Sequence, residues 1–256
     1  MAVKLEACAL GYGYPGRAVG RGLDLALPAG EVLCVLGPNG GGKTTLFRTL
    51  LGLLPAQAGE VLLEGQALAR MARADVARRI GYVPQGHVAQ FAFTVREAVL
   101  MGRTAHVGLF AAPGAADRAA AEQAIATLGI ESLADRVVTE LSGGERQLAM
   151  IARALAQGAR ALVLDEPTAS LDFGNQVRVL REIRRLAIDG YAVVFSTHDP
   201  GQAFLAASRV LLLAHGGSLR QGAPQEVITP QNLREVYGVE VRVAVVEGAR
   251  VCLPSL

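Results

Sequence analysis

Tryptophan is absent from this 256-residue chain, aromatic residues make up only 5% of it, and lysine occurs only twice. An excess of charge of one sign is also lacking, because 25 basic residues stand against 23 acidic ones, a net charge of +2. This balance argues against a strongly basic nucleic-acid binder and against an acidic tail. Hydrophobic residues make up 51% of the chain, which is too many for a disordered segment.

Long apolar runs are missing as well. The longest stretch without Asp, Glu, Lys or Arg spans residues 80–95 and contains glycine, proline, histidine and glutamine. A membrane-spanning helix needs about 20 mostly apolar residues, so we expect none here. The first ten residues lack the apolar core of a secretory signal. Cys8, Cys34 and Cys252 form no CxxC pair, which fits a reducing cytosol.

Short apolar runs alternate with segments of helical periodicity along most of the chain. The runs predict strands at 31–36, 59–63, 80–83, 161–164, 192–196 and 210–213. The periodic segments predict helices at 44–54, 71–79, 94–101, 116–128, 143–157, 174–188 and 200–206. This alternation predicts an α/β fold with a mainly parallel sheet covered on both faces. Residues 225–256 predict one short helix and a small β tail.

The sequence GPNGGGKT at 37–44 matches the phosphate-loop pattern GxxxxGK[ST] between a predicted strand and a predicted helix. Its glycines let backbone N–H groups converge on phosphate oxygens at a helix N-terminus. We expect nucleotide contacts from Gly37, Pro38, Asn39, Gly40, Gly41, Gly42, Lys43, Thr44 and Thr45. Lys43 would reach the β- and γ-phosphates and the Thr44 hydroxyl would ligate Mg²⁺. Since 23 of the 25 basic residues are arginine, a lysine kept here indicates that a compact ammonium is needed.

Two adjacent acids, Asp165 and Glu166, end the apolar run 161–164. A carboxylate at the end of a buried strand beside a phosphate loop can hold Mg²⁺ through water. Because adjacent side chains at a strand end point in different directions, Glu166 can face and orient a water molecule while Asp165 serves the metal. A strand-ending carboxylate that caps the next element is the structural alternative for Asp165.

Ser142 and Glu145 in LSGGE form a capping box ahead of a long helical segment. The intervening Gly143 and Gly144 are not needed for capping and weaken a helix. They would let an anion approach the helix N-terminus closely. From the residues alone, structural and functional interpretations both stand.

These motifs resemble those of ATP-binding cassette (ABC) ATPases, and they follow one another along the chain in the same order. The resemblance covers essentially the whole chain. The motifs are the phosphate loop, Gln85, LSGGERQ (141–147), LVLDEP (162–167), SLD (170–172) and STHD (196–199). The resemblance implies a phosphate-loop ATPase core at 1–85 and 156–225 with an N-terminal antiparallel β subdomain. An inserted α-helical subdomain would occupy 86–155, and a short extension 226–256.

The resemblance also implies a role for individual residues. Tyr14, with Tyr12 as the alternative, would stack on adenine. Gln85 would contact Mg²⁺ and the attacking water. Glu166 would be the general base and His198 the switch that senses the γ-phosphate. Ser142, Gly143 and Gly144 would contact the γ-phosphate held by a second cassette in a head-to-tail homodimer, and Asp172 would communicate across that dimer. His87, His106 and His215 show no ligand spacing.

Further segments are similar to ATPase subunits of metal-chelate importers, which serve ferric siderophores, haem, cobalamin or molybdate. They are FTVREAVLMGR (93–103), LADR (133–136), ASLDFGNQ (169–176) and VYGVEVRV (236–243). The resemblance implies a peripheral subunit on the cytoplasmic face of the inner membrane. Its partners would be integral-membrane permease subunits, docking near 104–116, and indirectly an extracytoplasmic binding protein, with no nucleic acid. The alternatives are an exporter ATPase, a soluble ABC factor, and a phosphate-loop kinase or GTPase.

Overall fold

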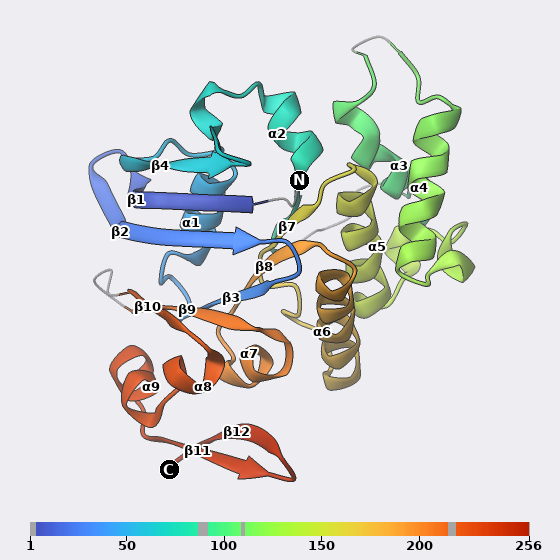
Figure 1. Cartoon of the computed structure of the whole chain (residues 1–256). Coiled ribbons are helices and arrows are strands. Elements are labelled where there is room, and N and C mark those ends of the chain that lie inside the picture. The colour runs from blue at the N-terminus through green and yellow to red at the C-terminus, as the bar shows by residue number, and fades with distance from the viewer. Residues whose placement is uncertain (1–3, 87–91, 109–110, 215–218, 256) are drawn as a thin grey trace. The chain divides into compact units, whose positions relative to one another are not determined.

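The structure is a computed structural model, and it describes residues 4–86, 92–108, 111–214 and 219–255. The chain divides into two compact units. The first contains Met1–Arg70 and Ile183–Leu256, and the second contains Met71–Glu182. Each unit is described separately below, with the elements labelled as in Figure 1.

The N-terminal part of the first unit is an antiparallel sheet, which confirms the expected N-terminal antiparallel β subdomain. It has the strand order β2-β1-β4-β5. The strands are β1 (Lys4–Tyr14), β2 (Arg17–Pro28), β4 (Ala58–Leu63) and β5 (Gln66–Ala67). Inward side chains such as Leu5 and Leu25 are buried. The register of β1 with β2 shifts between Ala7 and Leu10, where Ala9 has a φ of +45°.

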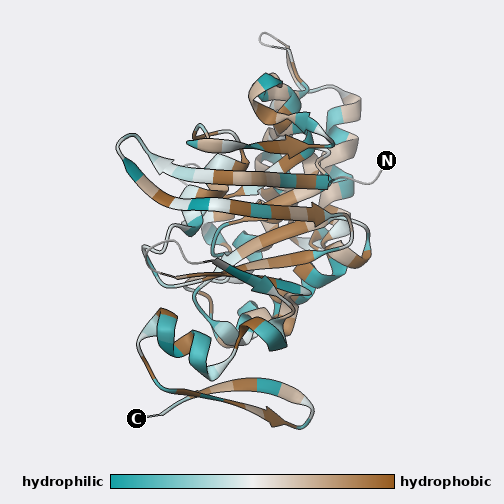
Figure 2. Cartoon of the chain, turned by 60° about the vertical axis from the view of Figure 1, so that its left-hand side comes forward, coloured by the Kyte–Doolittle hydropathy of each residue, from teal (hydrophilic) through white to brown (hydrophobic). Residues whose placement is uncertain are grey.

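The mainly parallel strands of the first unit follow the order β10-β9-β3-β8. They are β3 (Val32–Leu36), β8 (Ala192–Thr197), β9 (Arg209–Leu213) and β10 (Leu219–Gly222). β3 lies between β8 and β9 and is parallel to both, while β10 is antiparallel to β9. Every residue of β3 and β8 is buried, which explains why these strands read as continuous apolar runs. Figure 2 shows the same strands in the hydrophobic colours.

Two helices follow the carboxyl ends of these strands. α1 (Lys43–Leu50) follows β3, and α7 (Pro200–Ala206) follows β8. The expected helix at 44–54 was too long, because Leu51–Leu54 lie in turns in which Gly52 has a φ of +67°. The left-handed conformation at Gly52 ends the helix, and Pro55 cannot continue it.

The second unit consists of helices around one pair of strands. β6 (Ile80–Val83) and β7 (Ala161–Leu164) are parallel and have the bounds that the sequence predicted. The helices are α2 (Arg73–Arg79), α3 (Val95–Leu100), α4 (Ala115–Thr127) and α5 (Gly143–Ala156). α3, α4 and α5 pack against one another, as the green and yellow part of Figure 1 shows. α6 (Phe173–Ile188) runs on along the chain into the first unit.

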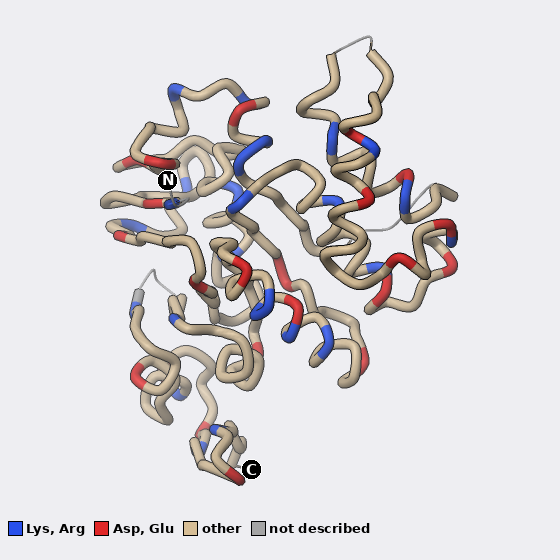
Figure 3. Tube along the Cα trace, turned by 45° about the vertical axis from the view of Figure 1, so that its right-hand side comes forward, with Lys and Arg blue, Asp and Glu red and all other residues tan. Residues whose placement is uncertain are grey.

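Charged residues of both signs occur over the described parts of the chain (Figure 3). Within the second unit they form ion pairs such as Arg103 Nε to Asp117 Oδ1, at 3.0 Å and partly buried. Asp117 also accepts the backbone N–H of Gly114. That hydrogen bond and the one from Arg103 hold the pKa of its carboxyl below the usual value.

The C-terminal segment differs from the single helix that the sequence predicted. It contains two short helices, α8 (Pro224–Val227) and α9 (Pro230–Tyr237), followed by a hairpin of β11 (Val241–Val246) and β12 (Ala249–Pro254). The break between the helices falls at Thr229 and Pro230. Thr229 caps α9 by accepting the N–H of Asn232, and Pro230 occupies the first turn. A proline with a capping residue before it starts a new helix rather than continuing the old one.

Candidate functional site: the phosphate loop and the motifs around it

The phosphate loop joins β3 to α1 through a backbone that only glycine adopts without strain. Gly40 and Gly42 have φ values of +76° and +95°. A Cβ atom added at Gly42 would lie 2.3 Å from Cγ1 of Val19. Gly42 is also the N-cap of α1, no side chain caps the helix there, and its first turn contains no acidic residue. The loop therefore offers backbone N–H groups and a positive helix end to an anion.

Lys43 lies inside this loop rather than in solvent, and the residue is only 5% exposed. Its Nζ donates hydrogen bonds to the carbonyl oxygens of Gly37, at 2.9 Å, and Pro38, at 3.0 Å. Thr44 and Thr45 follow in the first turn of α1, half-buried and buried respectively. The space between two main-chain carbonyls suits a compact ammonium group better than a planar guanidinium.

The two candidate adenine-stacking tyrosines have different environments. Tyr14 ends β1, is 40% exposed, and accepts a hydrogen bond from Arg48 Nη1 at 3.4 Å. Tyr12 is only 1% exposed, and its ring fills the space where a Cβ atom on Gly20 would lie. Burial raises the pKa of Tyr12 to about 12. Tyr14 therefore has a ring surface available to a ligand, whereas Tyr12 is a core residue beneath the loop.

His198 follows β8, at the edge of the sheet where β3 also ends. The backbone N–H of Gly37 donates to the carbonyl oxygen of Thr197 at 3.3 Å, so the phosphate loop and the His198 segment begin side by side. His198 itself is exposed. Asp199 caps α7 by accepting the N–H of Gly201 at 2.7 Å.

In the second unit, Gln85 and Glu166 meet after the ends of two neighbouring strands. The backbone N–H of Asp165 donates to the carbonyl oxygen of Val83 at 2.8 Å, which continues the pairing of β7 with β6. Asp165 is 1% exposed. Gln85 Nε2 donates to Glu166 Oε2 at 3.1 Å. Glu166 has a φ of +46°, a left-handed conformation that is uncommon outside glycine and is often found at active sites.

Ser142 and Glu145 form the capping box that the sequence predicted at the start of α5. Ser142 N–H donates to Glu145 Oε2 at 2.9 Å, and Glu145 N–H donates to Ser142 Oγ at 3.3 Å. The first of these hydrogen bonds is the main cause that holds the pKa of Glu145 below its ordinary value. The N-terminal end of α5 is therefore well defined, with Ser142 and Gly143 exposed.

The two glycines in this motif also have a packing role, which sequence reasoning did not identify. A Cβ atom on Gly144 would lie 2.1 Å from Asn175 Oδ1, and one on Gly143 would lie 2.9 Å from Cδ2 of Leu171. Asn175 is in turn held by Asp172, through Nδ2 to Oδ2 at 2.7 Å and N–H to Oδ1 at 2.9 Å. The helix start and the Asp172 loop thus pack too closely for any side chain at Gly144.

Asn175 is a site residue that the sequence analysis missed. Its signal is the spacing Asp-x-x-Asn at 172–175, in which an aspartate caps a helix by accepting the N–H three residues on. Of the histidines that lack ligand spacing, His106 contacts the carbonyl oxygen of Gln157 at 2.7 Å through Nε2. His87 and His215 lie outside the described residues.

The structure thus brings the predicted residues together in separate clusters. Within the first unit, Tyr14 of β1 contacts Arg48 of α1, the helix that follows the phosphate loop, and His198 lies at the sheet edge where the loop begins. Within the second unit, Gln85 meets Glu166, and Gly144 packs against the residue that Asp172 holds. A glycine cradle between a buried parallel strand and a helix defines the class of phosphate-loop nucleoside triphosphatases.

Comparison with known proteins specifies the family within that class. The family model described as "ABC transporter" matches residues 21–169, more than half of the chain. The chain is 41% identical over 233 residues to an ABC transporter ATP-binding protein of Haemophilus influenzae, covering 91% of this chain and 89% of that one. The chain therefore belongs to the ABC transporter family and is an ATP-binding ATPase of that family.

Two further relatives have named cargoes. One is the hemin import ATP-binding protein of Myxococcus xanthus, 42% identical over 89% of this chain and 87% of the relative. The other is the ferric enterobactin transport ATP-binding protein of Escherichia coli, 39% identical over 91% and 86%. A solved inward-facing structure assigned to the metal-chelate type of ABC transporter has a TM-score of 0.86 and 34% identity, covering 99% of this chain and 98% of that one. The expected resemblance to the metal-chelate importer group is confirmed.

Proposed function

We propose that this ATPase is the energy-coupling subunit of a membrane importer for a metal chelate, with a ferric siderophore as the first candidate and haem, cobalamin or molybdate as alternatives. The observation that carries the proposal is the similarity, over about nine tenths of the chain, to ATP-binding subunits named for hemin and ferric enterobactin. The similarity to a metal-chelate type transporter supports it.

For the ATP site, the proposal assigns phosphate binding to the glycine cradle and to Lys43, and adenine stacking to Tyr14. Thr44, Gln85 and Asp165 would hold Mg²⁺, which when bound offsets the charge of the phosphates. The donor set fits that ion, since it consists of hydroxyl, amide and carboxylate oxygens. Among the described residues no group of three or more His, Cys, Asp or Glu side chains could hold a metal by itself.

For hydrolysis, the proposal makes Glu166 the general base and His198 the residue that fixes the geometry of the γ-phosphate. Gln85 donates to Glu166 at 3.1 Å, and a carboxylate oriented in this way can accept a proton from water. Phosphoryl transfer depends mainly on positioning and charge neutralisation, so the loop that directs Glu166 matters as much as the carboxylate itself.

The proposal pairs two copies of the chain head-to-tail, with ATP between the phosphate loop of one copy and Ser142–Gly144 of the other. The exposed, capped start of α5 supports this, because a helix N-terminus with no bulky side chain suits a partner's γ-phosphate. ATP then closes the dimer and hydrolysis opens it, and this cycle would drive the permease.

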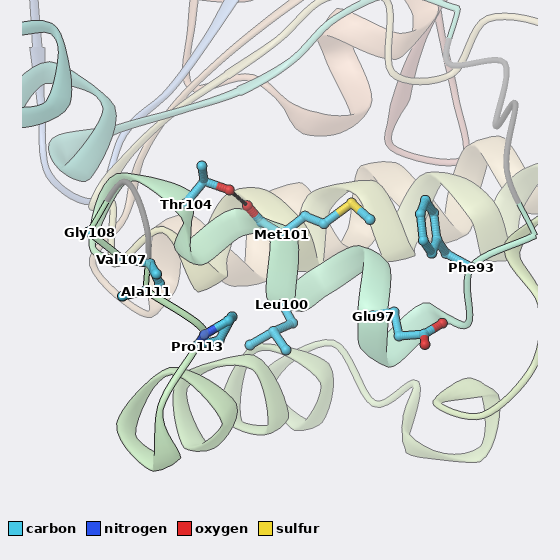
Figure 4. A pocket seen from close by; sticks show the side chains of 9 residues that line it. All are labelled: Phe93, Glu97, Leu100, Met101, Thr104, Val107, Gly108, Ala111 and Pro113. Carbon is cyan, nitrogen blue, oxygen red and sulfur yellow. Dashed lines mark hydrogen bonds between the residues drawn. The ribbon is translucent and has the colours of Figure 1, made fainter.

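The permease would dock in an apolar groove of the second unit. A cavity of about 580 Å³ is lined by residues of α3, by the turn after it and by the segment before α4. Figure 4 shows the lining residues Phe93, Glu97, Leu100, Met101, Thr104, Val107, Gly108, Ala111 and Pro113. Phe93 and Met101 are 38% and 42% exposed. Large exposed apolar side chains in a groove are typical of a helix-binding surface.

No helix of the described chain is long and apolar enough to cross a membrane. We propose that the chain attaches at the cytoplasmic face of the inner membrane through separate permease subunits, as in a transporter complex of this family. A binding protein outside the membrane would deliver the cargo, so the ATPase contacts it only indirectly.

Two experiments test this proposal. In a strain lacking the gene, uptake of ⁵⁵Fe-labelled ferric siderophore should fall, and the wild-type gene but not Glu166→Gln should restore it. Normal iron uptake with a defect in haem, cobalamin or molybdate uptake would reassign the cargo. Cargo accumulation inside the mutant cells would instead indicate an exporter.

The second experiment tests the groove. Met101→Arg should abolish co-purification with the permease while leaving ATP binding to the isolated subunit intact. Ile188→Arg is the matched control, because Ile188 is 82% exposed and lies at the end of α6. If Met101→Arg still co-purifies with the permease as the control does, the groove is not the docking site.

A further inference from the structure

We propose that Tyr237, in the C-terminal segment, is a positioning residue that holds the His198 switch in place. Tyr237 is the last residue of α9. Its hydroxyl donates a hydrogen bond of 3.1 Å to the main-chain carbonyl oxygen of His198, 39 residues away in the sequence. The C-terminal segment therefore contacts the switch directly, through the backbone carbonyl of the histidine.

Further hydrogen bonds order the residues on either side of His198. Thr197 Oγ1 donates to Gln202 Oε1 at 2.8 Å in a buried position, and the N–H of Asp199 donates to Thr197 Oγ1 at 3.1 Å. Asp199 caps α7. Tyr237 adds a hydrogen bond to the carbonyl oxygen of His198 itself, and His198 is exposed.

Tyr237 is itself rigidly placed. α9 is anchored by buried Leu233 and Val236 and by the ion pair between Arg220 of β10 and Glu235, at 2.7 Å. Gly238, with a φ of +70°, ends the helix directly after the tyrosine. Burial raises the pKa of Tyr237 well above its usual value, so the hydroxyl stays protonated and remains a donor at physiological pH.

The hairpin of β11 and β12 that follows α9 also packs near the His198 segment. β12 packs against α7, the helix that Asp199 caps, and β11 packs against α9. The thiol of Cys252 on β12 lies close enough to Asp199 for the aspartate to contribute to raising its pKa, with burial as the larger cause. The C-terminal segment thus contacts the carbonyl of His198, through Tyr237, and α7, through β12.

This inference rests on the proposed role of His198 in hydrolysis. Loss of the Tyr237 hydroxyl would let the switch loop move, so that His198 spends less time in its productive position. Tyr237→Phe keeps the ring and removes only the donor. We expect kcat to fall roughly three- to tenfold, the range set by one hydrogen bond, with the KM for ATP unchanged, because the phosphate loop is untouched.

The test is a double-mutant cycle on the full chain with ATP and Mg²⁺, in which kcat, KM and melting temperature are measured. Tyr191→Phe is the matched control, since Tyr191 lies just before β8, at the opposite end of that strand from His198. In a His198→Ala background Tyr237→Phe should have no further effect on kcat. An equal fold loss of kcat in both backgrounds, or no loss with His198 present, would overturn the inference.

Hydrogen–deuterium exchange gives a readout that does not depend on residual activity. Exchange in the 197–201 segment should become faster in Tyr237→Phe and stay unchanged in Tyr191→Phe. Unchanged exchange in Tyr237→Phe would also overturn the inference. If His198→Ala hydrolyses ATP at the wild-type rate, the proposed role of His198 in hydrolysis fails. The exchange result then still shows whether Tyr237 holds the 197–201 segment.

Discussion

Gln85 Nε2 and Glu166 Oε2 are joined by a hydrogen bond of 3.1 Å, although the two residues are 81 positions apart. Each residue lies just beyond the end of a strand, Gln85 after β6 and Glu166 after β7, and these two strands are parallel neighbours. The φ of +46° at Glu166 costs about 1–2 kcal/mol. A left-handed conformation outside glycine is often found at active sites, and it supports the proposed role of this carboxylate.

Glu166→Gln should leave ATP binding intact and lower the hydrolysis rate by about 10²–10⁴-fold, because the amide keeps the size and loses the base. The variant should run as an ATP-dependent dimer on gel filtration. Glu131→Gln, at an exposed position in the turn after α4, is the control and should hydrolyse ATP normally. Wild-type turnover in Glu166→Gln would remove the residue from this role.

Gln85→Ala should lower kcat about tenfold, since the carboxylate loses the hydrogen bond that orients it. The same change in a Glu166→Gln background should have little further effect if the two residues act as a unit. Steady-state kinetics on the four proteins measures this coupling, with Gln123→Ala on the exposed side of α4 as a control. Fully additive losses would separate the two roles.

Lys43→Ala should weaken ATP binding by roughly 10- to 100-fold as well as abolish turnover, because a cation is removed from bound phosphates. Lys43→Arg should also fail, since a guanidinium does not fit between the carbonyls of Gly37 and Pro38. Titration with a fluorescent ATP analogue measures both affinities. An active Lys43→Arg protein would show that the chain's preference for arginine over lysine has no bearing on this position.

Gly144→Ala should destabilise the protein, because the added Cβ would lie 2.1 Å from Asn175 Oδ1. Asn175→Gly removes the clashing side chain, so the double variant Gly144→Ala/Asn175→Gly should recover most of the lost melting temperature. Gel filtration with ATP then separates two roles of the glycine. A stable double variant that dimerises normally would mean that Gly144 serves packing alone, whereas one that fails to dimerise would mean that it also serves the partner's nucleotide.

Ser142→Arg should bind ATP as a monomer and fail to dimerise, because a bulky side chain covers the helix N-terminus meant for the partner's γ-phosphate. Mixing it with Lys43→Ala should restore part of the ATPase activity, since a mixed dimer has one site with both defects and one with none. This gain requires that a single intact site can turn over. Normal ATP-dependent dimerisation of Ser142→Arg would leave LSGGE as a capping box only.

Features set by neighbouring residues could be predicted from the sequence. The bounds of β6 and β7 were correct, as was the capping box of Ser142 and Glu145. Both depend on residues only a few positions apart, through hydrophobic burial or a local hydrogen bond. The phosphate loop is predictable for the same reason, because glycines within eight residues supply its backbone conformation.

Features set by contacts between distant segments could not be predicted in this way. The end of α1 at Leu50 and the start of α9 at Pro230 are errors of another kind, because Gly52 and the Thr229 cap are local signals that the predicted bounds overlooked. β10 was not predicted, because it depends on pairing with β9 for its place in the sheet. Tyr12 and Tyr14 have the same residue type two positions apart, yet only the packing of β1 decides that one is buried and the other exposed.

By itself, then, the sequence determined the phosphate loop, the order of the motifs and hence the family, because each of these is written in short runs of adjacent residues. The tertiary structure decided why Gly144 must be glycine, which carboxylate Gln85 orients, and that Tyr237 reaches the His198 carbonyl. Those three facts depend on contacts between residues 31, 81 and 39 positions apart. Such contacts form only when strands pair and helices pack, and no local pattern encodes a distance of that kind.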